Sequence, residues 1–147
     1  MKKLILLLLV AAFVGGNTLS AQTITKNEDG KYSLSVGHVT LTVDAQKGGK
    51  IVSYRYDDKE ILSQTKIPNS FGSTFWTSPQ SEWNWPPVPE YDTKPFNAEV
   101  AGDKLILTGE KSKRFGYRVR KELTTDKKDN AIVITYTIIN ESGETRK

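Results

Sequence analysis

The chain has 147 residues, with 21 Lys and Arg against 17 Asp and Glu, one His and no Cys. The lack of Cys excludes disulfides and thiolate metal sites. The small charge excess argues against nucleic acid or any other polyanion as a partner. The length suits one ordinary domain with its own hydrophobic core.

The first 21 residues have the pattern of a secretion signal. Lys2 and Lys3 precede an apolar run over residues 4–14, and Ala21 provides a small residue at the cleavage point. The run is too short to cross a bilayer, which needs about 20 residues. We therefore expect an exported protein, periplasmic or extracellular, that has no membrane association after signal cleavage and folds over residues 22–147.

Alternating apolar and polar residues predict strands in the first half of the folded part. The alternation runs from Tyr32 to Val36, and it shifts by one residue at Gly37, which indicates a hairpin turn. Gly48 and Gly49 precede a further strand and a second hairpin. The strands expected here cover residues 32–36, 39–43, 51–56 and 60–62.

Residues 67–95 interrupt this pattern. The segment contains all six prolines and all three tryptophans of the chain and has no long periodic run. We predict one long ordered loop with a short strand over residues 71–76, because its aromatic content argues against disorder.

Strand patterns return over residues 98–100, 105–107, 117–124 and 131–139. No amphipathic helix of useful length follows the predicted secretion signal. The predicted fold class is all-β, an antiparallel β-sandwich with short strands. Residues 132–139 are apolar on both faces, as in a central strand that needs partners on both sides. We therefore expect the chain to be the N-terminal part of a larger domain.

The aromatic segment supplies the candidate binding residues. Trp83 and Trp85 lie two positions apart, and Pro86 favours an extended backbone before it. In an extended backbone both indoles project to one side, about 7 Å apart. Such a platform suits the apolar face of a sugar ring, and polar neighbours suit its hydroxyls. The predicted carbohydrate-binding residues are Trp76, Gln80, Glu82, Trp83, Asn84, Trp85 and Asp92.

The same tryptophans also permit other interpretations. A Trp side chain buries about 150–250 Å², so the three rings are large enough to form a small core beneath the loop. A contact with another protein is a third possibility. We expect a mixture, with Phe75 and Trp76 inside and Trp83 or Trp85 at the rim.

Other motifs for chemistry are weak, and we predict no catalytic residue, metal site or cofactor in this chain. His38 is the single His, lies beside a turn, and is expected at the surface. No HExxH pattern supports a metal, and the Gly-Gly-Lys sequence at 48–50 lacks the spacing of a phosphate loop, so it is interpreted as a β-turn. The basic residues over 111–121 are interpreted as a solvated strand face plus a loop.

The hairpin over residues 32–43, followed by Gly48-Gly49-Lys50-Ile51, resembles the opening of galactose-mutarotase-like (aldose 1-epimerase-like) domains. Residues 71–87 are similar to a secreted bacterial subgroup of that superfamily whose function is unknown. The resemblance implies a larger two-sheet supersandwich with a carbohydrate site on one concave face. The epimerases use a His acid and a Glu base, and neither has a matching residue in this sequence.

Three functions stay open from the sequence. The first is carbohydrate binding without catalysis, favoured by the aromatic segment and by export. The second is a sugar-active enzyme of the aldose epimerase type, with its acid and base beyond the C-terminus. The third is a structural or interaction domain whose aromatic loop docks on another chain.

Overall fold

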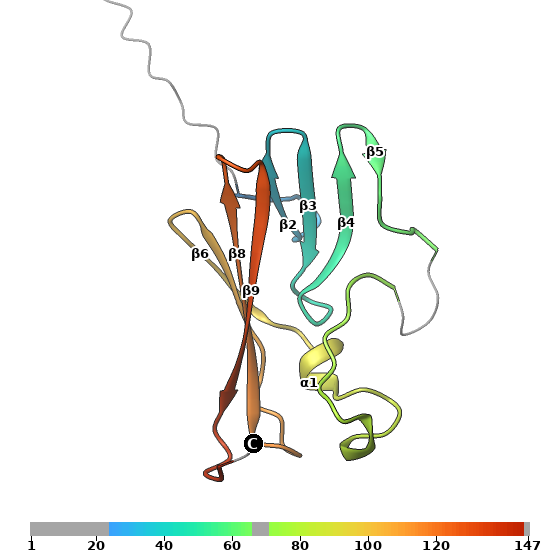
Figure 1. Ribbon diagram of the computed structural model, residues 1–147, viewed down its shortest axis with the longest axis vertical. Coiled ribbons are helices and arrows are strands. Elements are labelled where there is room, and N and C mark those ends of the chain that lie inside the picture. The colour runs from blue at the N-terminus through green and yellow to red at the C-terminus, as the bar shows by residue number, and fades with distance from the viewer. Residues whose placement is uncertain (1–23, 66–70, 146–147) are drawn as a thin grey trace, which may run out of the picture.

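The computed structural model describes residues 24–65 and 71–145, so the predicted signal over residues 1–21 lies outside the described residues. Two antiparallel sheets face one another, with strand orders β1-β2-β3-β4-β5 and β6-β7-β8-β9 (Figure 1). The predicted all-β antiparallel sandwich is confirmed.

The first sheet contains β1 (Ile24–Lys26), β2 (Tyr32–Val36), β3 (Val39–Asp44), β4 (Lys50–Tyr56) and β5 (Lys59–Glu60). The predicted turn between β2 and β3 is present, and Gly37 has a φ of 53° there, a conformation that glycine adopts at little cost. The short strand β1 was not predicted. It forms because Ile24 is buried in the core and pairs opposite Leu34.

The second sheet contains β6 (Asn97–Ala101), β7 (Lys104–Thr108), β8 (Tyr117–Asp126) and β9 (Ala131–Asn140). Strands that follow one another in sequence are neighbours in this sheet, so it is a meander. The β8–β9 pair is the longest, with Tyr117 opposite Asn140 and Asp126 opposite Ala131.

The core lies between the two sheets. It is built from alternate residues of the strands, which point to one face of each sheet because the side-chain period of a strand is two. The most deeply buried aliphatic side chains are Leu34, Val43, Leu105, Leu107, Val119 and Leu123.

The connection between the sheets differs from the prediction, because no strand forms over residues 71–76. The segment contacts β4 at one point: the amide of Ser73 donates to the Ile51 carbonyl, and the amide of Ile51 donates to the Ser73 hydroxyl, each at 2.9 Å. A short 3-10 helix η1 (Gln80–Glu82) and a single helical turn α1 (Pro89–Asp92) follow. Pro89 occupies the first turn of α1, where its missing N–H is tolerated.

β9 lies at a sheet edge, although its two apolar faces suggested a central strand. Within the described ranges it pairs with β8 alone. Val133, Tyr136 and Ile138 are consequently 46%, 39% and 50% exposed. The expectation that the chain belongs to a larger domain stays a prediction.

Across residues 24–65 and 71–145, the helices are too short and too polar to pass through a membrane.

Candidate functional site

The aromatic loop, residues 71–85, folds around one buried indole. Trp83 is 5% exposed, and its indole N–H donates to the Thr77 carbonyl at 2.9 Å. The amides of Trp83 and Asn84 both donate to the Gln80 carbonyl, which closes a tight turn. Trp83 therefore has helical backbone angles and Asn84 has a φ of 55°, in place of the predicted extended backbone.

Two indoles of this loop are exposed, and they differ from the expected pair. Trp76 and Trp85 are 42% and 57% exposed, with ring centroids 5.7 Å apart and planes at 87°. Trp76 also lies edge-on to Trp83 at 6.0 Å. We expected Trp76 inside and Trp83 or Trp85 at the rim, but the turn at η1 places Trp83 beneath Trp76 and leaves Trp76 exposed. We call the exposed pair the Trp76–Trp85 surface.

Contacts on both sides hold this loop in place. Phe75 stacks on Tyr136 of β9, with centroids 5.1 Å apart and planes at 10°. On the other side, the guanidinium of Arg114 donates to the carbonyls of Trp83, at 3.0 Å, and of Glu82. Arg114 belongs to the connection between β7 and β8. The loop therefore contacts the second sheet and its connections at two points, Tyr136 and Arg114. The sequence had placed Arg114 in a solvated basic stretch, and nothing in its local pattern indicated these carbonyl partners.

The predicted polar residues separate into two groups. Gln80, Glu82 and Asn84 are exposed on the turn that carries Trp83 and Trp85. Asp92 is elsewhere, since it ends α1 and is only 2% exposed. The structure therefore brings together six of the seven predicted residues and leaves Asp92 in a separate pocket.

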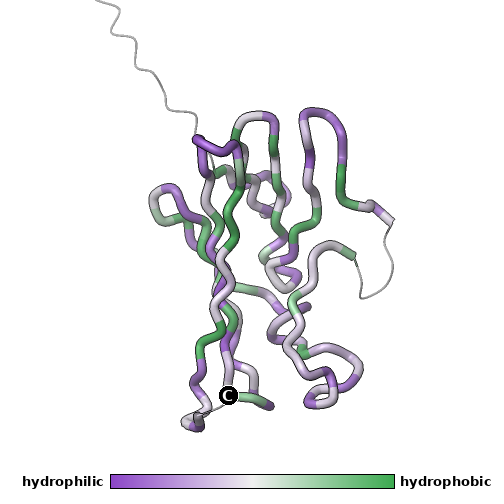
Figure 2. The backbone as a smooth tube through the Cα atoms, in the orientation of Figure 1, coloured by the Kyte–Doolittle hydropathy of each residue, from purple (hydrophilic) through white to green (hydrophobic). Residues whose placement is uncertain are grey.

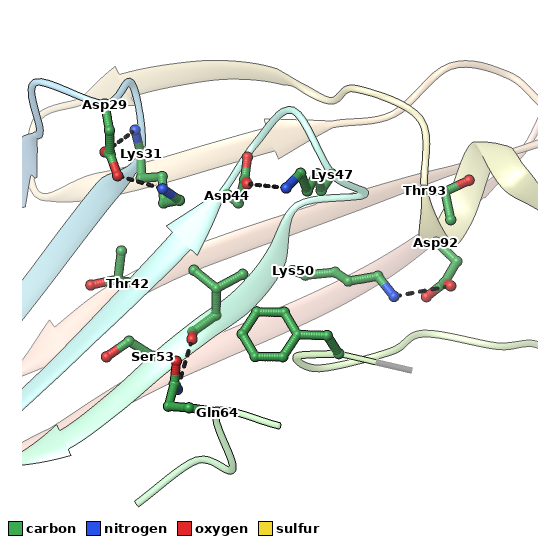
Figure 3. A pocket seen from close by; sticks show the side chains of 12 residues that line it. Asp29, Lys31, Thr42, Asp44, Lys47, Lys50, Ser53, Gln64, Asp92 and Thr93 are labelled. Atoms are coloured by element: carbon green, nitrogen blue, oxygen red, sulfur yellow. Dashed lines mark hydrogen bonds and ion pairs between the residues drawn. The ribbon is translucent and has the colours of Figure 1, made fainter. Parts of the chain in front are cut away.

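That pocket has a volume of about 630 Å³ and lies over β3 and β4, beside α1 (Figure 3). Its acidic and basic side chains occur in pairs: Asp29 with Lys31, Asp44 with Lys47, and Asp92 with Lys50. The remaining lining residues are Thr42, Val52, Ser53, Gln64, Phe71 and Thr93.

The pair at the inner end of this pocket is buried. The Lys50 ammonium lies 3.1 Å from Oδ2 of Asp92, and both side chains are under one-tenth exposed. The other carboxylate oxygen of Asp92 has no hydrogen-bond partner among the described residues. The interpretation of the sequence at 48–50 as a β-turn therefore omitted the role of Lys50, because its partner lies 42 residues away.

Lys121 adds a second ammonium beneath the same turn. It is 3% exposed, and its Nζ donates to the carbonyls of Gly48 at 2.7 Å and Gly49 at 3.1 Å. The interpretation of this residue as part of a solvated face was wrong. Its position between Val119 and Leu123 points it inward, and the two carbonyls accept from two of its three donors.

Burial lowers the pKa of Lys121 from its ordinary 10.5 to about 8; the nearby Asp92 carboxylate opposes this shift, and the Lys50 ammonium adds to it. Below about pH 8 the side chain is protonated in both the folded and unfolded states. Between pH 8 and 10.5 the unfolded chain retains the proton that the folded protein has released. The free energy of unfolding should therefore rise, by up to about 1.4 kcal/mol per pH unit from this group.

From pH 8 to 10, the unfolding free energy of the unaltered protein should rise relative to that of the Lys121→Met variant. Urea titrations at each pH measure it, and groups common to both proteins cancel. A difference that stays constant across this range would contradict the buried, titrating ammonium.

His38 lies where the sequence placed it, at the exposed turn between β2 and β3. Its Nδ1 is 2.7 Å from a carboxylate oxygen of Asp57, and its ring stacks on Tyr56. Over the described ranges, no three His, Asp or Glu side chains gather in a way that suits a metal ion.

Comparisons with protein-family models, curated proteins and solved structures give no match. The fold thus defines the protein as an antiparallel two-sheet β-sandwich, and the mutarotase-like resemblance stays a prediction.

Proposed function

We propose that the protein binds carbohydrate through the Trp76–Trp85 surface, as an exported protein. One observation carries this proposal: two indoles that touch each other remain about half exposed while a third is buried beneath them. Large aromatic side chains grouped at a surface are characteristic of binding sites in soluble proteins.

The geometry suits a sugar ring. Pyranose rings have apolar C–H faces and polar hydroxyl edges. Because the planes of Trp76 and Trp85 are nearly perpendicular, one indole can lie against a C–H face while the other borders the edge of the same ring. The exposed side chains of Gln80, Glu82 and Asn84 supply hydrogen-bond acceptors and donors on the same turn.

The loop is ordered before any ligand arrives. The Trp83–Thr77 hydrogen bond, the Arg114 contacts and the Phe75–Tyr136 stack hold the turn in one conformation. Ordering a loop on binding costs free energy, so a loop that is already ordered binds more tightly for the same contact area. The ordered loop therefore lowers the free-energy cost of binding a glycan at the Trp76–Trp85 surface.

Affinity electrophoresis in gels containing soluble polysaccharides, with tryptophan fluorescence titrations of the corresponding oligosaccharides, tests the proposal. We expect binding to at least one glycan, and a loss of at least about tenfold in affinity for Trp76→Ala and for Trp85→Ala, equivalent to about 1.4 kcal/mol.

Tyr56→Ala is the matched control, because Tyr56 is 53% exposed but lies outside the aromatic loop. Its affinity should be unchanged. A folded protein that binds none of a broad glycan panel, or whose binding survives both Trp substitutions, would contradict the proposal.

A further inference from the structure

β9 has the longest and least protected free edge among the described strands. It has ten residues and no charged side chain. The other free edges, on β1, β5 and β6, are two to five residues long and carry Lys26, Lys59 with Glu60, and Glu99. Proteins normally protect sheet edges by shortening them or by placing charges on them. β9 has neither protection.

Among the described residues, the backbone groups of β9 that point away from β8 form a regular row without hydrogen-bond partners. The amide of Glu141 donates to the Gly116 carbonyl at 2.9 Å, in register with the β8–β9 pairing. In an antiparallel pair, the backbone N–H and C=O groups of successive residues point alternately toward the partner strand and away from it. The odd-numbered residues of β9 therefore bond to β8, and the N–H and C=O groups of Ile132, Ile134, Tyr136 and Ile138 point to the free edge.

An apolar surface extends beyond this edge. β2 and β3 are the strands that pack across from β9, and β4 continues past it (Figure 1). A groove of about 450 Å³ lies between β9 and the strands β3 and β4. Its apolar lining includes Tyr54, Ile51, Ile132 and Ile134, and Ser73 of the aromatic loop borders it. Tyr54 is 39% exposed there, and Figure 2 shows hydrophobic stretches on both strands. We call this edge and groove the β9 corner.

We propose that the β9 corner binds an extended peptide as a further antiparallel strand, whose alternate apolar side chains enter the groove beneath β4. An extended backbone is the ligand that matches a row of alternating N–H and C=O groups at strand spacing. The uncharged edge fits a peptide without charges along the paired stretch. The strand is supplied by a second, different polypeptide.

A second copy of the chain does not fit the same place. If two β9 strands paired antiparallel about a two-fold axis, both first sheets would lie on the same side of the joined sheet. Each β4–β5 hairpin lies beyond its own β9 (Figure 1), so the two hairpins would approach each other on that side. The corner therefore suits a single strand rather than another sandwich.

Residue-resolved hydrogen exchange tests the proposal on the exported chain. The probe is a synthetic ten-residue peptide with blocked ends, in which Val or Ile alternates with Thr and two Lys residues follow for solubility. In the free protein, the amides of Ile134, Tyr136 and Ile138 should exchange rapidly, whereas those of Thr135 and Thr137 should be protected. Adding the peptide should slow exchange of the first group at least tenfold and leave the second unchanged.

Two control peptides and two protein variants make the outcome specific. A peptide of the same composition with its apolar residues grouped together, and one with alternate amides N-methylated on the pairing side, should both fail to protect β9. Tyr54→Ser should weaken binding of the alternating peptide at least fivefold, and Val100→Ser, a similarly exposed site on β6, should not.

Two results would overturn the proposal. The first is rapid exchange of Ile134, Tyr136 and Ile138 at saturating peptide. The second is protection of these amides in the free protein that increases with protein concentration together with a doubled mass in light scattering, because a second copy would then occupy the edge.

Discussion

Gly48→Ala should lower the free energy of unfolding by more than about 3 kcal/mol, a loss that only a backbone clash or a buried defect produces. A Cβ at position 48 would lie 2.0 Å from the carbonyl oxygen of Asp92, and neither backbone can move freely, because the Gly48 amide donates to the Lys94 carbonyl at 2.9 Å. The φ of 66° adds about 1–2 kcal/mol for a non-glycine residue.

Gly102→Ala is the matched control for this substitution. Gly102 has a φ of 62°, and a Cβ there would meet no atom within 4 Å. It should therefore show only the conformational cost of about 1–2 kcal/mol. Urea unfolding followed by circular dichroism measures both variants, and equal losses would contradict the close approach between the β3–β4 turn and α1.

Asp92→Ala should cost about 3–5 kcal/mol of unfolding free energy, because it leaves a buried ammonium without its partner. Lys50 loses its 3.1 Å contact, and Lys121 loses the nearby carboxylate that favours its charged form. The loss should be smaller above pH 8, where Lys121 releases its proton in the folded protein.

The double variant Lys50→Met with Asp92→Leu separates lost charge pairing from lost packing. Replacing both members of a buried pair by apolar residues is often neutral, so the double variant should recover most of the stability that Asp92→Ala loses. Lys104→Met breaks a partly exposed pair with Glu122 and should cost less than about 1 kcal/mol. A loss of similar size for Asp92→Ala and Lys104→Met would contradict a buried pair that depends on both charges.

Apart from the controls, the residues changed in these predictions meet where the β3–β4 turn contacts α1, a place we call the junction. The turn at Gly48 contacts the end of α1, Lys50 pairs with Asp92, and Lys121 donates to the turn from the opposite sheet. Because α1 follows the aromatic loop in the chain, the junction and Arg114 together determine where that loop lies. Carbohydrate binding at the Trp76–Trp85 surface should therefore depend on the stability of the junction, although none of its residues is proposed to touch the glycan.

The period of two in the apolar residues was sufficient to predict the main strands of the sandwich and the β2–β3 hairpin. This succeeds because a strand that buries one face must alternate its side chains, whatever its partners are. The local pattern missed β1, since three residues form a strand only when a neighbour accepts their hydrogen bonds. It also suggested a strand over residues 71–76, where the aromatic content is typical of a strand but, among the described residues, only Ser73 hydrogen-bonds to a neighbouring strand, β4.

The sequence by itself determined the fold class, the aromatic loop and the residue types available for binding. Only the tertiary structure decided which indoles are exposed, because the turn at η1 places Trp83 under Trp76. It also decided which charged residues are buried. Asp92, Lys50 and Lys121 are buried together, since segments distant in sequence supply their partners. Strand pairing and burial depend on those distant segments, whereas side-chain periodicity depends on the local chain alone.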